Sequence, residues 1–147
     1  MQSFKLLYLP VLFTILAIWI FSCILYLFFL GLGLYKVNNR NHRPSNKLFI
    51  ILMVYSLCYS LLFGSTLIVG NNTLLSQNLF PSIFPFHLLA LVATVYAFRF
   101  NAKLLVSYEI GENAHIANYI GEFFLFWFMP IGIWILQPRI NKISHNT

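Results

Sequence analysis

The sequence predicts an all-α integral membrane bundle of four transmembrane helices. Hydrophobic residues make up 60% of the 147 positions and charged residues only 8%, and the mean hydropathy of +0.80 lies outside the range of soluble domains. The apolar residues form continuous runs of about twenty, whereas barrel strands would alternate in segments of about ten. Because no long polar stretch interrupts the chain, we expect a single membrane domain covering residues 1–147.

Each of four apolar runs is long enough to cross a hydrocarbon core of roughly 30 Å at about 1.5 Å per residue. The runs cover about residues 7–35, 48–69, 81–100 and 119–136. The first is longer than the apolar region of a signal peptide and lacks a cleavage pattern, so we expect it to be retained. Pro130 and Gly132 interrupt the short fourth run, which is therefore a kinked span, the interpretation we favour, or a re-entrant segment.

Cations in the loops predict which side of the membrane each loop occupies. Segment 36–47 contains no acidic residue and four basic ones, Lys36, Arg40, Arg43 and Lys47. The positive-inside rule therefore places this loop in the cytoplasm, and the uncharged segment 70–78 on the outer side. For a bacterial protein the membrane would be the cell inner membrane.

Four crossings would place both termini outside. Arg99 and Lys103 then return to the cytoplasmic side, which leaves six of the nine basic residues there. Arg139 and Lys142 would lie on an exterior tail, against the positive-inside rule. If the fourth run re-enters, the C-terminus is cytoplasmic instead.

Small side chains at regular spacing predict where helices pack. In the second run they recur every four residues, at Ser56, Ser60 and Gly64. In the third run Ala93 and Ala97 have the same spacing. Small residues let two membrane helices approach closely, so we expect these two runs to pack as an antiparallel hairpin. Tyr55 and Tyr59 flank the first face, and their hydroxyls require hydrogen-bond partners within a membrane. We interpret His87 as a structural, interfacial histidine.

All three acidic residues, Glu109, Glu112 and Glu122, fall within fourteen positions. Glu109 and Glu112 belong to a polar, partly amphipathic connection before the last helix. Glu122 lies just inside the fourth run, where an ionisable group near lipid indicates a functional site. Glu109, Glu112 and His115 follow each other in three-residue steps, which would place them on one slowly rotating stripe of a helix. Because Gly111 can interrupt a helix, a helix, a bend and a second helix fit this segment as well as one unbroken helix does.

Glu112 and His115 have the E-x-x-H spacing of di-iron carboxylate proteins. That architecture needs a second such pair and further carboxylates, which the sequence lacks, so we expect neither a metal nor another cofactor. Arg99 and Lys103 are expected to pair with the nearby acids. For Glu122 we favour a carboxylate that reaches the interface, with pairing to Arg99 or protonation as the alternatives.

No motif for a nucleophile, a phosphate loop or a nicotinamide cofactor is present. The net charge is +6, but the sequence has no element that recognises nucleic acid. The cations are therefore expected to contact lipid headgroups. We expect a protein that acts by association, as an accessory subunit or membrane-embedded effector of a homo- or hetero-oligomeric assembly. A small oligomeric channel or transporter using Glu122 with Arg99 is the alternative, and a metal-dependent membrane enzyme is third.

Overall fold

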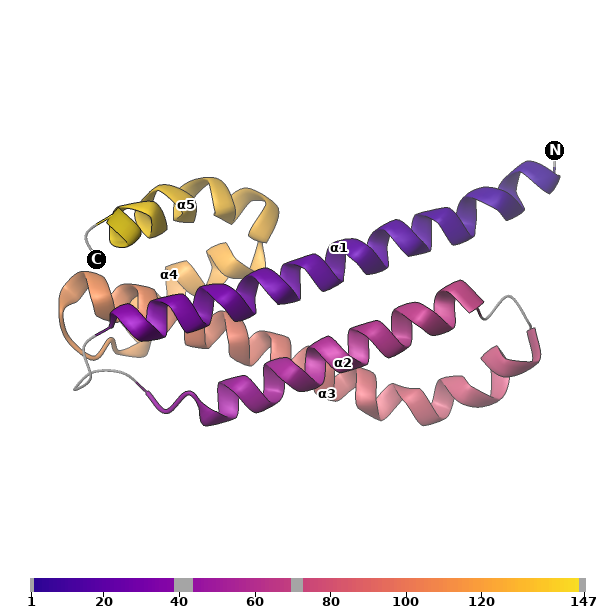
Figure 1. The fold of residues 1–147 in the computed structure, drawn as a ribbon, viewed down its shortest axis with the longest axis horizontal. Coiled ribbons are helices and arrows are strands. Elements are labelled where there is room, and N and C mark those ends of the chain that lie inside the picture. The colour runs from indigo at the N-terminus through magenta and orange to yellow at the C-terminus, as the bar shows by residue number, and fades with distance from the viewer. Residues whose placement is uncertain (1, 39–43, 70–72, 146–147) are drawn as a thin grey trace. The chain divides into compact units, whose positions relative to one another are not determined.

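The computed structural model describes residues 2–38, 44–69 and 73–145, and every regular element within them is a helix (Figure 1). The helices are α1 (Gln2–Val37), α2 (Lys47–Val69), α3 (Thr73–Ile110), α4 (Ile116–Trp127) and α5 (Met129–His145). Arg40 and Arg43 of the predicted cytoplasmic loop lie outside the described residues. The all-α prediction is confirmed for the described part of the chain.

Within the described residues, three helices are long and apolar enough to cross a membrane. The candidate spans are Thr14–Val37, Lys47–Ser65 and Ile83–Ile110. They coincide with the first three predicted runs, although α3 continues ten residues past the predicted end at residue 100. These helices support a membrane location, while the predicted count of four spans is not confirmed.

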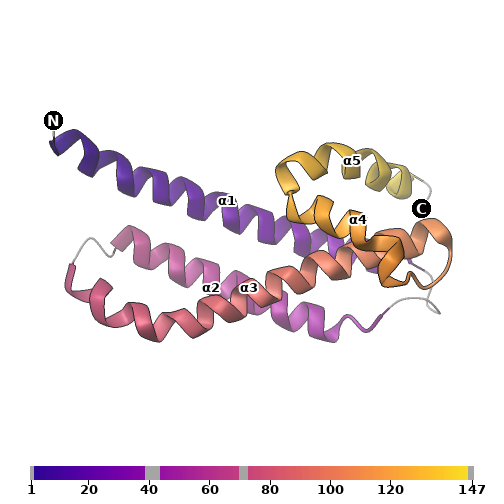
Figure 2. The ribbon, with the colours of Figure 1, turned by 180° about the vertical axis from the view of Figure 1, so that it is seen from behind.

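The fourth predicted run, 119–136, is divided between α4 and α5. α4 ends at Trp127 and α5 begins at Met129, and Figures 1 and 2 show α5 running back alongside α4. With 12 residues, α4 is about 18 Å long, well short of a hydrocarbon core of roughly 30 Å. This run therefore forms a helical hairpin instead of the single kinked helix we favoured.

The hairpin turn follows from its sequence. Pro130 occupies the first turn of α5, where its missing N–H leaves no intrahelical bond unmade. The Phe128 carbonyl accepts hydrogen bonds from the backbone N–H groups of Ile131, at 3.0 Å, and Gly132, at 2.8 Å. Gly132 also packs against the backbone of Leu125, so its lack of a side chain lets α5 fold onto α4.

The described helices contribute to two compact units. The first comprises Met1–Tyr26 and Ile51–Thr94, and the second Leu27–Ile50 and Val95–Thr147. In the first unit, the Tyr55 hydroxyl donates to the Phe86 carbonyl at 2.9 Å. The Tyr59 hydroxyl lies 3.1 Å from Nδ1 of His87. The two tyrosines that needed partners thus join α2 to α3.

The second unit has a buried core built around Asn101 of α3. Its Nδ2 donates to the Leu27 carbonyl of α1 at 3.1 Å. One helical turn beyond Leu27, Gly31 contacts both Asn101 and the ring of Phe49. Phe49 stacks on Phe100 with ring centroids 4.3 Å apart. These contacts hold α1, the start of α2 and α3 together.

A second hydrogen bond from a side-chain amide also joins the α1 segment to α3. Nδ2 of the buried Asn38 donates to the Leu104 carbonyl at 3.2 Å. Buried amide groups are stable only when hydrogen-bonded, so Asn38 and Asn101 fix how α1 and α3 pair in this unit.

Candidate functional site

The polar connection is a helix, a turn and a second helix. α3 ends at Ile110, and the next residue, Gly111, has φ of +69°, a left-handed conformation that favours glycine after a helix. The Ser107 hydroxyl then accepts a hydrogen bond from the Ala114 backbone N–H at 3.0 Å. α4 begins two residues later, at Ile116. Glu109, Glu112 and His115 therefore do not share one helical face.

Two of the three acids meet at Arg139 of α5. Its Nε donates to Oε1 of Glu109 at 2.7 Å, and its Nη2 contacts Oε2 of the same carboxylate. Nη1 and Nη2 each lie 3.0 Å from Oε1 of Glu122. Because Glu109 lies on α3 and Glu122 on α4, one guanidinium joins three helices. We call Glu109, Glu122 and Arg139 the carboxylate clamp.

The carboxylate clamp is partly shielded from solvent. The exposed fractions of the side chains are 31% for Arg139, 32% for Glu109 and 17% for Glu122. Hydrogen bonds to Glu109 raise the pKa of Arg139 above its usual range, against the opposing effect of burial, and Glu122 adds to the rise. Glu109 also occupies the last turn of α3, where the helix dipole disfavours an acid. A permanently charged arginine offsets that repulsion.

The other predicted site residues lie apart from the clamp. Nε of Arg99 donates to the hydroxyl of Tyr119 at 3.2 Å, so Arg139 has the position beside Glu122 that one hypothesis gave to Arg99. Glu112 and His115 are exposed in the turn between α3 and α4. Within the described ranges, no three His, Cys, Asp or Glu side chains are placed to hold a metal ion.

Arg139 is not among the site residues that the sequence pattern indicates. One feature of the sequence does draw attention to this residue, because a cation on the predicted exterior tail disagrees with the positive-inside rule. The distance along the chain from Arg139 to Glu109 and Glu122 concealed the pairing, which requires α5 to fold back on α4.

The predicted packing residues occupy buried or half-buried positions. Ala93 and Ala97 are fully buried, and Ser56 is 1% exposed. The half-buried Ser60 donates to the Leu57 carbonyl of its own helix at 2.9 Å. Gly64 is buried beside α1, where a Cβ added to it would lie 3.9 Å from Cβ of Ala17. Within the first unit, Gly64 of this small face is thus directed toward α1.

The α4–α5 hairpin has two different faces. Tyr119 and Phe126 of α4 and Leu136 of α5 are buried. Other positions of both helices carry large apolar side chains that the described residues do not cover, and Trp134 is the most open of them at 81% exposed. This apolar stripe consists of Ile116, Ile120, Phe124, Trp127, Phe128, Ile131, Trp134 and Ile135.

The carboxylate clamp is suited to holding helices together. Four N–H···O contacts to two carboxylates occupy most of the donors of Arg139, so the group resembles a structural network more than a site for a substrate. No family model, curated protein or solved structure matches this chain.

Proposed function

We propose that this protein is a small multi-pass membrane protein that acts by association, as an accessory subunit or membrane-embedded effector of a homo- or hetero-oligomeric assembly. The observation that carries the proposal is the apolar stripe on α4 and α5. Large exposed apolar patches mark surfaces that contact a membrane or another protein. The stripe lies on a hairpin whose first helix is too short to cross the bilayer, so it is available to a partner.

The carboxylate clamp supports this function by fixing the stripe. Arg139 bonds to α3 through Glu109 and to α4 through Glu122, so both helices of the hairpin are anchored to α3. A surface that is already ordered loses less conformational entropy on binding than a flexible one. The clamp therefore favours an association surface of defined shape.

The proposed topology has three spans, with the hairpin on the cytoplasmic side. The loop 36–47 is cytoplasmic, as the positive-inside rule predicts. A cytoplasmic hairpin adds Arg139 and Lys142 to the six basic residues already on that side, so eight of the nine are cytoplasmic. This distribution favours three spans over four, and it places the stripe at the inner interface of the bilayer.

The channel alternative has less support. Its key carboxylate, Glu122, is bonded to Arg139 and belongs to a helix of 12 residues, which is too short to line a pore across the hydrocarbon core. Replacing Glu122 with glutamine should leave ion flux in liposomes unchanged. A flux that the wild type supports and Glu122→Gln alters would favour the channel.

The association is tested by measuring the mass of the protein purified in a gentle detergent. We expect a complex of fixed stoichiometry, formed with copies of itself or with a co-purified membrane protein. Replacing Ile131 and Trp134 together with alanine should weaken the complex at least tenfold. The matched control replaces Leu61 and Leu62 of α2, which are also exposed, and should leave it intact.

A monomer without partners, or equal losses in the two double variants, would contradict the association. Cross-linking in membranes separates the two kinds of assembly. In a chain lacking Cys23 and Cys58, the substitution Trp134→Cys should give a covalent dimer if the stripe contacts a second copy. A different cross-linked mass would identify a hetero-oligomer.

The topology is tested by a reporter fused after Thr147. We expect the reporter to be active on the cytoplasmic side, together with one inserted in segment 36–47. A reporter in segment 70–78 should be active on the outer side. An exterior C-terminus would restore the four-span arrangement.

A further inference from the structure

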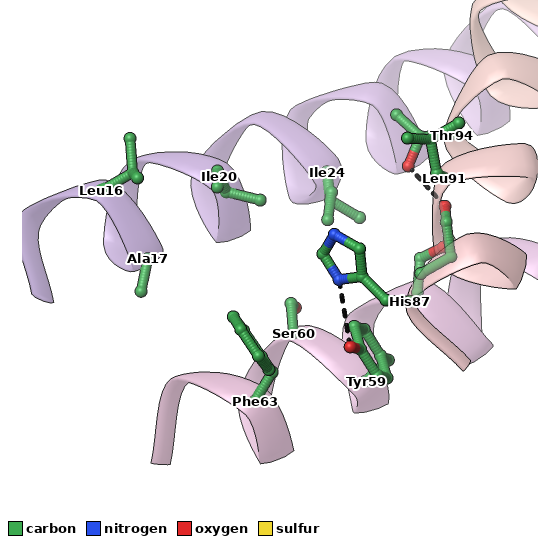
Figure 3. A pocket seen from close by; sticks show the side chains of 12 residues that line it. Leu16, Ala17, Ile20, Ile24, Tyr59, Ser60, Phe63, His87, Leu91 and Thr94 are labelled. Carbon is green, nitrogen blue, oxygen red and sulfur yellow. Dashed lines mark hydrogen bonds between the residues drawn. The ribbon is translucent and has the colours of Figure 1, made fainter. Parts of the chain in front are cut away.

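The first unit contains a pocket of about 430 Å³, within the range of roughly 300–1,000 Å³ typical of ligand sites. Figure 3 shows it between helices α1 and α2, with His87 of α3 projecting into it. Six of the twelve lining residues are aliphatic, Ile20 and Ile24 among them. Two polar atoms of this wall, Oγ of Ser56 and Nε2 of His87, have no hydrogen-bond partner among the described residues.

The first of these groups is the hydroxyl of Ser56. The residue is 1% exposed, lines the pocket, and its Oγ has no hydrogen-bond partner. Serines in helices usually donate to a carbonyl one turn earlier, as Ser60 does to Leu57 and Ser65 does to Leu62. A buried hydroxyl without a partner is unfavourable, so a ligand oxygen that meets it after a rotation of the Ser56 side chain toward the pocket would stabilise Ser56.

The second group is the imidazole of His87. Its Nδ1 lies 3.1 Å from the Tyr59 hydroxyl. When the hydroxyl donates this hydrogen bond, Nε2 carries the ring hydrogen. In Figure 3, Nε2 points away from Tyr59 toward the α1 side of the pocket. It has no hydrogen-bond partner among the described side chains. The pocket thus offers a ring N–H donor and a hydroxyl within an apolar wall.

The position along the helices indicates where the occupant comes from. The lining residues fall between Leu16 and Ile24, between Ser56 and Phe63, and between His87 and Thr94. These segments occupy the same half of each candidate span, the half farther from segment 36–47. A ligand therefore reaches the pocket from the lipids of one leaflet.

The shape of the wall favours a chain over a flat ring. The aromatic side chains contact one another, because Tyr59 and Phe63 are stacked with ring centroids 5.9 Å apart and the ring of His87 is tilted against both at 5.7–5.8 Å. These contacts occupy part of each ring, while Leu16, Ile20, Ile24 and Leu91 supply aliphatic surface on α1 and α3. An apolar chain that ends in a carbonyl matches both the wall and the two polar groups.

We propose that this pocket binds one long-chain fatty acyl group, whose carbonyl or carboxyl oxygens accept hydrogen bonds from Nε2 of His87 and Oγ of Ser56. The acyl group belongs to a free fatty acid or to an acyl ester of the bilayer. Both sources have the same recognition chemistry. The mass of the lipid extracted from the purified protein distinguishes them.

The experiment titrates palmitic acid into delipidated protein in detergent and follows binding and thermal stability. We expect one molecule per chain and a ligand-dependent rise in Tm. Ser56→Ala should weaken binding at least tenfold, and His87→Leu should do the same. Because Ser56→Ala removes an unpartnered hydroxyl, the ligand-free variant should be at least as stable as the wild type. A loss of binding would then not reflect unfolding.

The matched control is Ser65→Ala, which alters an exposed serine of the same helix outside the pocket. It should bind palmitic acid as the wild type does. Ala90→Phe should block the pocket and abolish binding. The proposal is overturned if palmitic acid does not bind, if Ser65→Ala weakens binding as much as Ser56→Ala, or if the purified protein retains a quinone or a second copy of the chain in place of an acyl lipid.

Discussion

Gly132 of α5 lies directly against the backbone of Leu125 of α4. A Cβ added to Gly132 would come within 3.0 Å of Cα of Leu125 and would collide with the carbonyl group of the same residue. Backbone atoms within a helix cannot move aside as the end of a flexible side chain can. The close contact between α4 and α5 therefore requires glycine at position 132.

Gly132→Ala should open or distort the hairpin. Overpacking of this kind costs about 1–3 kcal/mol, so we expect a lower Tm in detergent and faster proteolysis near Phe128. The control is Gly121→Ala, because a Cβ there meets no atom within 4 Å. Alanine at position 121 should be neutral or stabilising. Equal stability of the two variants would contradict the contact.

Gly31→Ala should destabilise the second unit. An added Cβ would lie 2.7 Å from Oδ1 of Asn101 and closer still to the ring of Phe49, which is fully buried and stacked on Phe100. We expect a loss of about 1–3 kcal/mol, measured by chemical unfolding in detergent. Gly33→Ala is the control, since nothing lies within 4 Å of its Cβ. If Gly31→Ala and Gly33→Ala unfold alike, α1 does not pack at position 31.

Arg139→Gln should loosen the α4–α5 hairpin. The substitution leaves the carboxylates of Glu109 and Glu122 without the cation that bridges them, and Glu122 is only 17% exposed. Because the clamp is partly open to solvent, we expect a loss of about 1–3 kcal/mol. Hydrogen exchange of α4 and α5 should increase. The exposed Lys142 of the same helix provides the control, and Lys142→Gln should change stability by less than about 0.5 kcal/mol.

The contribution of Arg139 should not depend on pH across the accessible alkaline range. Its pKa is raised in the folded chain, above all by the hydrogen bond to Glu109. The stabilisation is complete below the pKa of the unfolded chain and is lost only as pH rises through the higher folded value. The stability difference between wild type and Arg139→Gln should be constant from about pH 7 to about pH 10.

Arg139→Lys tests the same linkage with a group that titrates. An ordinary lysine has a pKa of about 10.4, so any stabilisation by this lysine should decline as pH rises beyond that value, whereas that of arginine persists. Thermal melts at several pH values measure both. A parallel alkaline decline in the wild type would show that the charge of Arg139 is not responsible.

Gly111→Ala should destabilise the turn between α3 and α4. At φ of +69°, a residue with a Cβ is strained by about 1–2 kcal/mol. Gly111→Asn should lose less, because asparagine adopts the left-handed conformation more readily. Thermal unfolding should rank the wild type first, asparagine next and alanine last. Since no atom lies within 4 Å of the added Cβ, a larger loss with asparagine would contradict this backbone explanation.

The sequence alone predicted the helices that form from long apolar runs. The predicted run 48–69 differs by one residue from α2, Lys47–Val69, because its cationic start and apolar length define a span by composition. The predicted end of the third run at residue 100 was too early. α3 continues because Leu104 and Leu105 are buried by tertiary contacts, which a count of polar residues does not reveal.

The candidate site was predicted less completely than the helices. The sequence indicated that Glu109 and Glu122 needed explanation, and it associated them with nearby cations because distance along the chain was the only measure available. Arg139 lies 30 residues from Glu109, and only the chain reversal at Phe128 brings the two together. The sequence therefore gives the positions of the acids along the chain, but it does not identify the cation that pairs with them.

The sequence by itself determined that the chain is helical and suited to a membrane, because these properties follow from apolar residues accumulated over twenty positions. The tertiary structure decided that the last apolar run is a hairpin and that Arg139 joins Glu109 to Glu122. It also decided that Ser56 is buried without a partner beside His87. These features depend on close approach between helices, as at Gly132 and Leu125, where the absence of one side chain determines which backbones can touch.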